Sequence, residues 1–426
     1  MPGPGIAGKP ARTQGMLRST AAGFCATLVG VGLARFAYTP LLPAIIGAGW
    51  FDASSAAYLG AANLAGYLAG ALLGRPMAAR FDTVATLRAM MLLAALAFFA
   101  CAYPLSLPWF FSWRLLSGIA GGVLTVVAAP AVLAQVDPAR RGVAGGILFM
   151  GVGLGVAASG TLVPRLLQIG LRETWFGLGA IALLLTALAW KGWPQRTVAA
   201  VHGTRAVQGR QALHAADPAL AVSTAKPTSA TETLHRAKLL LLALWILYAL
   251  HAVAWMPHMI FLVDYIARGL GQGLQIGAQY WVWFGIGATI GPLAAGAIAD
   301  RIGFGLALRL AFVIELVGVA LPALHHEPVW LIASSLSVGA FVTGVVPLVL
   351  GRLHELLGHD PARRDAAWRT ATVCFAVVQA LAAYGMSFLF SHTQGNYPLL
   401  FLIGAAAMMV VIGIDLATLM RNRRNP

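Results

Sequence analysis

Long apolar stretches alternate with short polar ones along almost the whole chain. A helix of about 20 apolar residues is long enough to cross the roughly 30 Å hydrocarbon core of a bilayer. Twelve stretches reach that length, and their approximate bounds are 18–46, 53–79, 84–107, 109–135, 143–168, 174–190, 238–264, 274–299, 304–324, 328–351, 368–391 and 397–420. The pattern therefore predicts an all-α membrane protein with twelve transmembrane helices.

The longest polar interruption separates the first six stretches from the last six. From Trp193 to Arg236 small and polar residues dominate and little apolar periodicity is left, as in a flexible linker. The two halves also echo each other, since the segment YTP at 38–40 resembles WMP at 255–257. We expect an N-terminal six-helix bundle over 1–190, a cytoplasmic linker over 191–237 and a C-terminal six-helix bundle over 238–426.

Composition and charge agree with a membrane protein. The 426 residues are 59% hydrophobic and 10% charged, against about 45–50% and about 25% in soluble domains. The net charge is +15, and all but five of the 29 Lys and Arg residues lie in the even-numbered loops, the linker and the two ends; the five are Arg35, Arg114, Arg165, Arg172 and Arg268. By the positive-inside rule we expect these loops and both termini to be cytoplasmic, in a bacterial-type inner membrane. The basic charge is thus a topology signal and predicts no nucleic-acid partner.

The sequence offers no convincing signal peptide, metal or enzyme motif. Residues 1–15 are polar and lack a short apolar core with a cleavage site, so we expect the first helix to be retained. Cys25, Cys101 and Cys374 fall inside predicted helices without pair or metal spacing. In the segment HELLGHD at 354–360 the histidines are five apart, where a zinc site on one helix needs four. We therefore expect no cofactor, no metal and no enzymatic activity.

A motif with a physical role closes the eighth stretch. Its members form the pattern G-x-x-x-D-R-x-G beside a short loop, and they are Gly296, Asp300, Arg301 and Gly303. An aspartate at a helix end can accept hydrogen bonds from the first amides of a neighbouring helix and pair with arginine, which makes a latch between rocking bundles. A simple helix-capping pair is the alternative. Together with twelve helices and a central linker, the motif resembles the loop signature of the major facilitator superfamily.

Further elements carry the same resemblance, with two departures. Arg114 and Gly118 match the superfamily's R-x-x-x-G element, which implies an arginine in the central cavity linked to proton movement. In the fifth stretch Gly155 is followed by valine, where the exchangers of the superfamily have proline. In the first-half loop Ala78 stands where the latch carboxylate is expected, and Asp82 is a shifted substitute.

More narrowly, GVGLARFAYTPLLP, AAYLGAANLAGYLAGALLG and RRDAAWRTATVCFAVVQALAAY resemble the YbfB/YjiJ-like branch of the superfamily. The resemblance implies the major facilitator fold, alternating access, and a cavity lined by the first, fourth, seventh and tenth helices. The substrate-binding candidates on these helices are Arg35, Tyr38, Arg114, His251, Trp255 and His258, with polar support from Ser334, Ser335, Ser337 and Thr343. The second-rank cavity candidates are Asn63, Tyr67, Gln279 and Gln379.

An arginine inside the first apolar stretch needs a reason, because one at the bilayer centre costs roughly 2.5 to 3.5 kcal/mol. The cavity has two arginines and two histidines but no central acid, since Asp264 lies near the outer end of the seventh stretch, and Glu315 and Asp415 lie on helices that the resemblance makes peripheral. Such a cavity should attract anions. Arg35 would bind a carboxylate or phosphate with two hydrogen bonds, and Tyr38 and Trp255 would contact the organic part. The alternative is that Arg35 pairs with an internal acid or with helix-end carbonyls.

Histidines and prolines add candidate roles in coupling and gating. His251 and His258 are two helical turns apart and share a face, so either can carry a proton that couples transport to the membrane gradient. A structural hydrogen bond is the alternative for each. Pro257, between them, and Pro40 and Pro43 in the first stretch permit the bent helices that gating needs.

These features predict a secondary active transporter that moves a small organic solute, with an anion as the expected cargo and protons as the candidate coupling ion. Efflux of drugs or metabolites is one alternative, and a non-transporting membrane sensor is another. The expected partners are a small-molecule substrate, protons and the lipid bilayer, and the expected assembly is a monomer.

Overall fold

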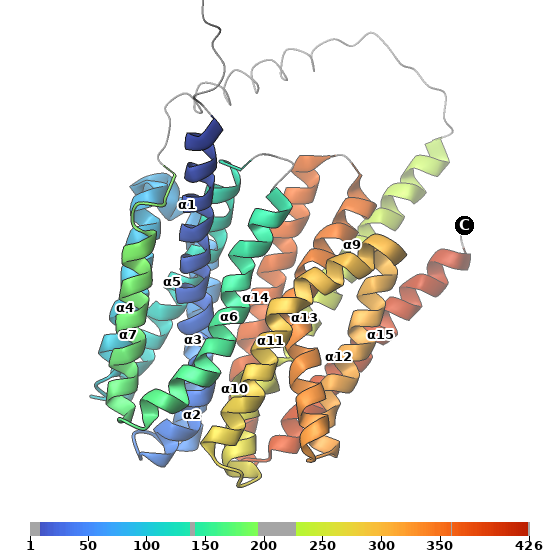
Figure 1. Cartoon of the computed structure of the whole chain (residues 1–426). Coiled ribbons are helices and arrows are strands. Elements are labelled where there is room, and N and C mark those ends of the chain that lie inside the picture. The colour runs from blue at the N-terminus through green and yellow to red at the C-terminus, as the bar shows by residue number, and fades with distance from the viewer. Residues whose placement is uncertain (1–8, 137–140, 195–226, 359, 425–426) are drawn as a thin grey trace, which may run out of the picture.

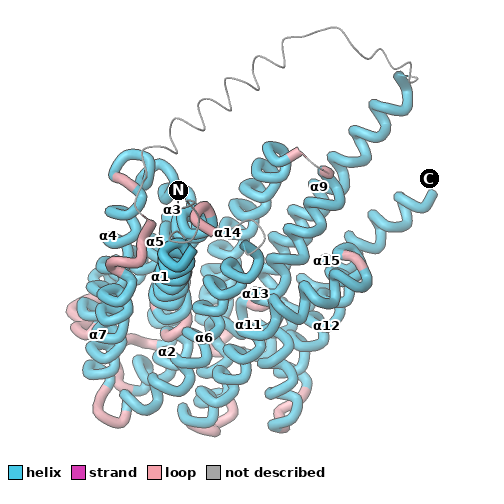
Figure 2. Tube along the Cα trace, turned by 45° about the horizontal axis from the view of Figure 1, so that its top comes forward, coloured by secondary structure: helices cyan, strands magenta, loops and turns pink. Residues whose placement is uncertain are grey.

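The computed structural model describes residues 9–136, 141–194, 227–358 and 360–424, which form a bundle of long helices (Figure 1). Figure 2 shows that short loops join the helices, and no strand occurs in these ranges. Twelve segments are long and apolar enough to cross a membrane, as the hydrophobic pattern predicts. The first helix begins and the last helix ends on one side of the bundle, here called the terminal face (Figure 1). The opposite side is called the distal face.

The helices fall into two sets of six spans. The first set contains α1 (Lys9–Thr27), the π-helical η1 (Leu28–Leu33), α2 (Tyr38–Gly47), α3 (Ala53–Phe81), α4 (Thr83–Cys101), α5 (Leu107–Leu133), α6 (Arg141–Leu167) and α7 (Leu171–Ala189). The second set contains α9 (Pro227–Ala254), α10 (Met256–Asp264), the π-helical η3 (Tyr265–Gly269), α11 (Leu274–Ile302), α12 (Phe304–Leu324), α13 (Pro328–Leu357), α14 (Pro361–His392) and α15 (Tyr397–Arg424). The first span comprises α1, η1 and α2, and the seventh comprises most of α9 with α10 and η3.

Most of the predicted linker over 191–237 lies outside the described residues, as does His359 of the HELLGHD segment. The described end of the linker differs from the prediction, because α9 begins at Pro227 and takes in the residues up to 237. Proline is favourable at the first helical position, since its missing N–H would have no partner there. The division into two bundles and a linker stays a prediction.

Proline interrupts the first and seventh spans. Pro40 has no N–H to donate and its ring clashes with the carbonyl four residues earlier, so residues 34–37 form a turn before α2. Pro257 acts in the same way, and Trp255 separates α9 from α10. These breaks lie where Pro40 and Pro257 predict bends, whereas Pro43 lies inside the continuous helix α2. The breaks also free backbone carbonyls in the middle of the bundle, beside Arg35.

Close packing inside each half depends on glycine. A methyl group added at Gly66 of α3 would lie 2.0 Å from the carbonyl oxygen of Leu115 in α5. Helices α11 and α13 repeat the arrangement, because a methyl group at Gly291 would lie 2.0 Å from the carbonyl oxygen of Ala340. Glycines recur at four-residue spacing in both helices, at 66, 70 and 74 in α3 and at 287 and 291 in α11. They therefore build two corresponding helix pairs in near-backbone contact.

Gly66→Ala is expected to destabilise the protein, because the atom that the new methyl group meets belongs to the backbone and cannot rotate away. Overpacking of this kind costs about 1 to 3 kcal/mol. Gly385→Ala in α14 is the matched control, since a methyl group there has no atom within 4 Å. Thermal unfolding followed by tryptophan fluorescence should show a lower melting temperature for the first variant only. Equal effects of the two changes would contradict the packing argument.

The two halves contact each other toward the distal face. Helices α2, α3 and α6 of the first half pack against α10, α14 and α11 of the second. Near the distal end of this contact, the rings of Tyr58 in α3 and Tyr384 in α14 have centroids 6.2 Å apart. Closer to the terminal face, a methyl group at Gly145 of α6 or Gly296 of α11 would have no atom within 4 Å. The contacts between the halves therefore include the distal side, and at the terminal side the backbone at Gly145 and Gly296 is uncrowded.

Asp52 caps helix α3 at the distal face. Its Oδ1 accepts a hydrogen bond from the Ser55 amide at 2.9 Å, and its Oδ2 accepts one from the Ser55 hydroxyl at 2.7 Å. These hydrogen bonds favour the charged carboxylate and hold the pKa of Asp52 below its ordinary value. The stability from the cap is therefore present above the ordinary carboxyl pKa of about 3.9, and it is lost as the pH falls through the lowered folded value.

Asp52→Ala is expected to lower the free energy of unfolding at neutral pH by about 0.5 to 2 kcal/mol, the usual cost of a lost N-cap. Asp52→Asn keeps a capping oxygen but does not titrate, so it should lose less stability and show a weaker acid dependence. Melting temperatures between about pH 3 and about pH 7 measure both effects. If the two variants lose equal stability at neutral pH, the cap does not act through its side-chain oxygen.

Candidate solute-binding site

Arg35 lies in the turn between η1 and α2, and its side chain reaches the other half of the protein. Its Nη2 donates to the sulfur of Met259 in α10 at 3.5 Å. The guanidinium carbon also lies 5.2 Å from the ring centroids of Phe36 and Tyr67 and 5.4 Å from that of Trp255. Only 6% of Arg35 is exposed. Aromatic faces and a thioether replace only part of the hydration that a buried guanidinium loses.

Arg114 of α5 binds a backbone carbonyl oxygen at the break in the first span. Its Nη1 donates to the carbonyl oxygen of Ala34 at 2.9 Å, and its guanidinium carbon lies 4.3 Å from the ring centroid of Tyr38. The Tyr38 hydroxyl donates to the carbonyl of Ala56 in α3 at 2.7 Å. Asn63 donates to the backbone carbonyl of Arg114 at 3.3 Å. From the sequence, a helix-end carbonyl is an alternative partner of Arg35. In the structure such a carbonyl, that of Ala34, accepts from Arg114 instead.

The two arginines keep buried N–H groups without an acceptor. Arg35 Nε and Arg114 Nε and Nη2 have no hydrogen-bond partner. No carboxylate in the described part of the chain pairs with either guanidinium. The described spans of the first half contain one acid, Glu173, at the distal end of α7. The centre of the protein therefore has a positive field and unpaired donors, which favour an anionic ligand.

Aromatic and hydroxyl side chains join the halves beside the arginines. Phe36 packs against Trp255 and Trp281, with centroid distances of 6.5 and 6.0 Å. Trp281 of α11 donates its indole N–H to the hydroxyl of Ser159 in α6 at 3.1 Å. The Thr39 hydroxyl in α2 donates to a backbone carbonyl of α10. These contacts join the two halves beside the arginines in this conformation.

The two histidines face the interior of the second half. His251 Nδ1 lies 2.8 Å from Glu315 Oε2 in α12, and both side chains are buried. His258 Nε2 lies 2.7 Å from the hydroxyl of Ser334 in α13. His251 thus binds α12 and His258 binds α13, inside the second half, and the span that carries both is broken between them at Trp255. Glu315, which the sequence analysis set apart as peripheral, is the direct partner of His251.

The second-rank candidates occupy different surroundings. Asn63 and Tyr67 lie with the arginines, at the contacts described above. Gln379 of α14 is 1% exposed, and neither atom of its amide has a partner. Gln279 of α11 is exposed and lines a groove between α6 and α11, next to Gln168. The structure therefore gives no support to Gln279 as part of a central cavity.

The predicted latch residues are unengaged at the terminal end of α11. Within the described ranges, Asp300 and Arg301 are exposed and take part in no hydrogen bond or ion pair. Glu355 of α13 instead accepts from the amide of Phe304, at the start of α12, at 3.0 Å and pairs with Arg352 at 2.5 Å. The latch stays a prediction, since Asp300 and Arg301 have no partner in this conformation.

The turns before α4 and α12 correspond in the two halves. Asp82 has φ of 73° and Gly303 has φ of 84°, the left-handed region that favours glycine. Asp82 accepts from the amides of Val84 at 3.0 Å and Ala85 at 3.2 Å. Asp82 is thus the N-cap of α4, which is the helix-capping role that stands as the alternative to a latch.

Sequence reasoning missed several contributors to this site. Phe36, Thr39 and Met259 connect the halves next to Arg35. Apolar and hydroxyl residues are ordinary in membrane helices, so nothing in their type distinguishes them. Glu315 did carry a signal, because an acid within an apolar span is costly and usually functional.

Comparison with known proteins shows that the chain is similar to transporters. It matches the family described as "Uncharacterised MFS-type transporter YbfB" over residues 27–224 and 212–416. The uncharacterized transporter YgaY of Escherichia coli O157:H7 is 31% identical over 157 residues, and its counterpart in Escherichia coli K12 matches equally. This match covers 37% of the chain and 40% of the relatives, so it spans less than half of their length.

Solved structures share the fold at low sequence identity. The xylose transporter XylE from E. coli has a TM-score of 0.68 and 14% identity, over 93% of this chain and 97% of that chain. The nucleoside transporter NupG has a TM-score of 0.69 and 15% identity, over 95% of this chain and 99% of that chain. Likeness at such identities concerns the fold alone, and it confirms the twelve-helix major facilitator fold expected from the sequence.

Proposed function

We propose, from the premise that this chain belongs to the family of MFS-type transporters represented by the uncharacterised YbfB, that it carries a small organic anion across the membrane by alternating access. Membership of this family makes the chain a multi-pass transporter of the major facilitator superfamily and not an enzyme. The family does not define the solute, so we infer the solute class from the side chains of the site.

The pair of buried arginines carries the proposal. Arg35 and Arg114 hold three nitrogen atoms without an acceptor, beside the rings of Tyr38, Tyr67 and Trp255. A carboxylate or phosphate would supply the missing acceptors, and the rings would contact the organic part of the solute. Xylose and nucleosides, the solutes in the names of XylE and NupG, carry no such group. The arginines therefore favour a different class of solute in this chain.

We also propose that the terminal face is cytoplasmic. Basic residues flank the spans at this face, among them Arg75, Arg80, Arg301 and Arg363, and the positive-inside rule assigns such ends to the cytoplasm. With this orientation the contacts on the distal side support an inward-facing state, and the XylE structure is described as "partially occluded inward open". Rocking of the halves would then open the site to the other side.

Export and sensing are the rival functions. An exporter of cationic drugs would need a carboxylate free to meet the solute, and no carboxylate in the described ranges pairs with Arg35 or Arg114, while Asp264 is taken up by Arg268. A non-transporting sensor would bind solute without moving it. The arginine pair supports the anion carrier over the cation exporter, and flux separates a carrier from a sensor.

Reconstitution into liposomes tests the proposed function. The probes are labelled monocarboxylates, dicarboxylates and sugar phosphates, each paired with an uncharged analogue such as the amide or the free sugar, together with pentoses and nucleosides. We expect saturable uptake of at least one class of anion and none of its uncharged analogue. Uptake of uncharged probes alone would contradict the proposal, and binding without flux would indicate a sensor.

A further inference from the structure

A second buried polar cluster lies in the second half, away from the arginines. His251 Nδ1 of α9 and Glu315 Oε2 of α12 are 2.8 Å apart, with exposed fractions of 1% and 0%. His251 Nε2 and Glu315 Oε1 have no partner. Ionisable side chains inside a membrane are costly and are retained mainly where they have a function. The pair therefore needs an explanation beyond packing.

The hydrogen bond between these residues survives the gain or loss of one proton. When His251 is a neutral imidazole with its proton on Nδ1, that N–H donates to the Glu315 carboxylate and the pair has a negative charge. When a proton is added at Nε2, the same Nδ1–H still donates, and the pair becomes an imidazolium and a carboxylate with no net charge. The free Nε2 is thus the atom at which a proton can enter or leave.

Aromatic rings enclose the pair. The ring centroids of Tyr248, Phe312 and Phe375 lie 6.3, 6.4 and 6.2 Å from that of His251. Two ion pairs lie on the helices packed around the pair, Arg309 with Asp415 at 2.6 Å and Arg352 with Glu355 at 2.5 Å. The other titratable or charged groups on these helices include Tyr67, His258, Arg369, Cys374 and Tyr384. The charges of the two ion pairs are compensated, whereas Arg369 and Arg364 of α14 form no ion pair among the described residues. The His251–Glu315 pair itself lies among aromatic rings.

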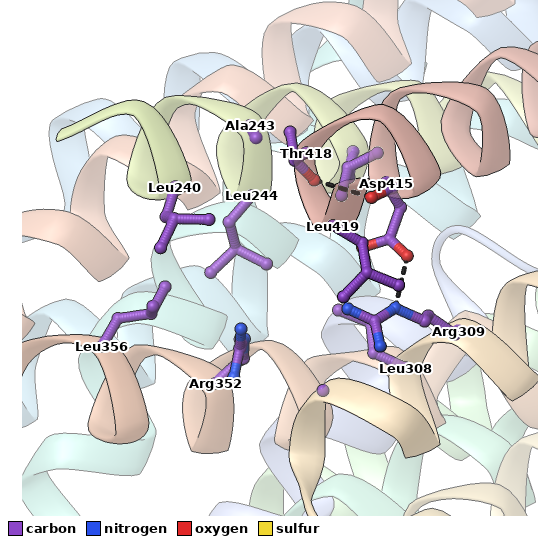
Figure 3. A pocket seen from close by; sticks show the side chains of 12 residues that line it. Leu240, Ala243, Leu244, Leu308, Arg309, Arg352, Leu356, Asp415, Thr418 and Leu419 are labelled. Carbon is purple, nitrogen blue, oxygen red and sulfur yellow. Dashed lines mark hydrogen bonds and ion pairs between the residues drawn. The ribbon is translucent and has the colours of Figure 1, made fainter. Parts of the chain in front are cut away.

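A cavity lies in the second half, and Figure 3 shows the side chains that line it. Its volume is about 70 Å³, and it lies between α9, α12, α13 and α15. A water molecule needs roughly 10 to 15 Å³ of such space, so the cavity admits several. In Figure 3 the ion pair of Arg309 and Asp415 lies on one side of it, opposite Leu240 and Leu356. The charged lining makes the cavity suitable for water and protons.

The faces that line this cavity continue to the pair. On α9, Leu244 and Leu247 line the cavity, and His251 follows one turn beyond Leu247, about 6 Å along the helix. On α12, Leu308 lines the cavity and Glu315 follows about two turns beyond it. The apolar layer between the cavity and His251 is therefore about one helical turn thick.

We propose that His251 and Glu315 form the proton-coupling site of this transporter and that the cavity between α9, α12, α13 and α15 connects them to the cytoplasm. The inference rests on the proposed function, and it places the proton path inside the second half while the solute path runs between the halves. A proton adds to His251 Nε2 when the site is open to the outside. It leaves from the same atom to water in the cavity, and the neutral imidazole remains.

Electrostatics set the direction of coupling. The protonated pair has no net charge, whereas the pair without this proton leaves an uncompensated carboxylate charge among aromatic rings. The inward-facing arrangement, in which the pair is buried, therefore favours the protonated state. Loss of the proton to the cytoplasm destabilises this arrangement and favours return to the outward-facing state, as uptake driven by inward proton flow requires.

Distance measurements without any solute test this inference. Spin labels at Ala48→Cys and Gln275→Cys report the separation of the halves at the distal face, where both positions are exposed. The background carries serine in place of Cys25, Cys101 and Cys374. In lipid nanodiscs, electron–electron resonance should show a short distance at low pH and a growing population with a long distance as the pH rises. One linked proton changes the ratio of the two populations by up to about tenfold per pH unit.

Variants of the pair should abolish this response. Glu315→Gln removes the buried charge and is expected to keep the distal side closed at every pH, and His251→Gln removes the nitrogen that titrates. The double variant keeps two neutral amides and serves where a single variant does not fold. Glu327→Gln is the matched control, because Glu327 forms an exposed pair with His325 at 3.8 Å in the same half. A wild type without a pH response, or glutamine variants that retain it, would overturn the proposal.

The access path has its own test. Leu244→Trp fills the cavity and should leave the equilibrium populations of the two conformations unchanged. After a pH jump, the rate at which the populations reach equilibrium should fall severalfold. Leu242→Trp is the control, since Leu242 is 50% exposed on the same helix. An unchanged rate in Leu244→Trp would overturn the cavity as the path. A pH response in a protein that transports no anion would refute the proposed solute and leave the proton site standing. Anion transport by a protein without a pH response would refute the proton site and leave the proposed solute standing.

Discussion

Replacing Arg35 with methionine is expected to abolish anion binding and transport while leaving the folded protein at least as stable. A solute carboxylate would lose its buried charged partner, which costs about 2 to 5 kcal/mol, or at least about thirtyfold in affinity. Methionine fills much of the same volume and removes a guanidinium whose placement in the membrane costs roughly 2.5 to 3.5 kcal/mol. Arg35 has no carboxylate partner among the described residues that its removal would leave unpaired.

The measurements are anion uptake in liposomes and the melting temperature of the same preparation. Arg172→Met is the matched control, because Arg172 also lies over an aromatic ring, 4.4 Å from the centroid of Tyr103, but is exposed at the distal end of α7. Arg114→Met should lower the melting temperature as well as transport, since the Ala34 carbonyl would lose its donor. Full anion uptake by Arg35→Met would refute the assigned role.

Cross-linking the halves at the distal face is expected to stop transport completely. Tyr58 and Tyr384 belong to different halves, and their rings have centroids 6.2 Å apart in this conformation. Alternating access requires them to separate when the distal side opens. In a cysteine-free background, Tyr58→Cys with Tyr384→Cys should lose transport after treatment with a short bifunctional methanethiosulfonate and recover it after reduction.

A cross-link within one half is the control for this experiment. Phe99 of α4 and Phe176 of α7 have ring centroids 5.9 Å apart, a similar distance, but both belong to the first half. Cross-linking Phe99→Cys to Phe176→Cys should leave transport unchanged if each half moves as a rigid unit. Unimpaired transport by the cross-linked Tyr58 and Tyr384 pair would contradict rocking of the halves about the central site.

Much of the architecture could be predicted from local sequence. The twelve spans follow from apolar length, and the breaks near Arg35 and at Trp255 follow from Pro40 and Pro257. The start of α9 could not be predicted, because residues 227–237 are too polar to extend the apolar pattern and still form helix. Local hydropathy indicates whether a segment can cross the membrane. It indicates little about how far a helix continues beyond the membrane.

The site was only partly predictable. Residue type marked Arg35 and Arg114, because buried charge is expensive wherever it lies in a membrane. Residue type did not show that His251 faces Glu315, or that Gln279 faces an outer groove, because helices of one sequence can rotate about their axes without changing their hydropathy. The face that a helix turns toward its neighbours depends on which other helices pack there.

The sequence by itself determined the membrane class, the number of spans and the presence of costly buried cations, since hydropathy, span length and charge are properties of short segments. Only the tertiary structure decided the partners: Arg35 meets Met259 across 224 positions of the chain, and His251 meets Glu315 across 64. Such contacts depend on the packing of whole helices against one another, and no local pattern specifies that packing.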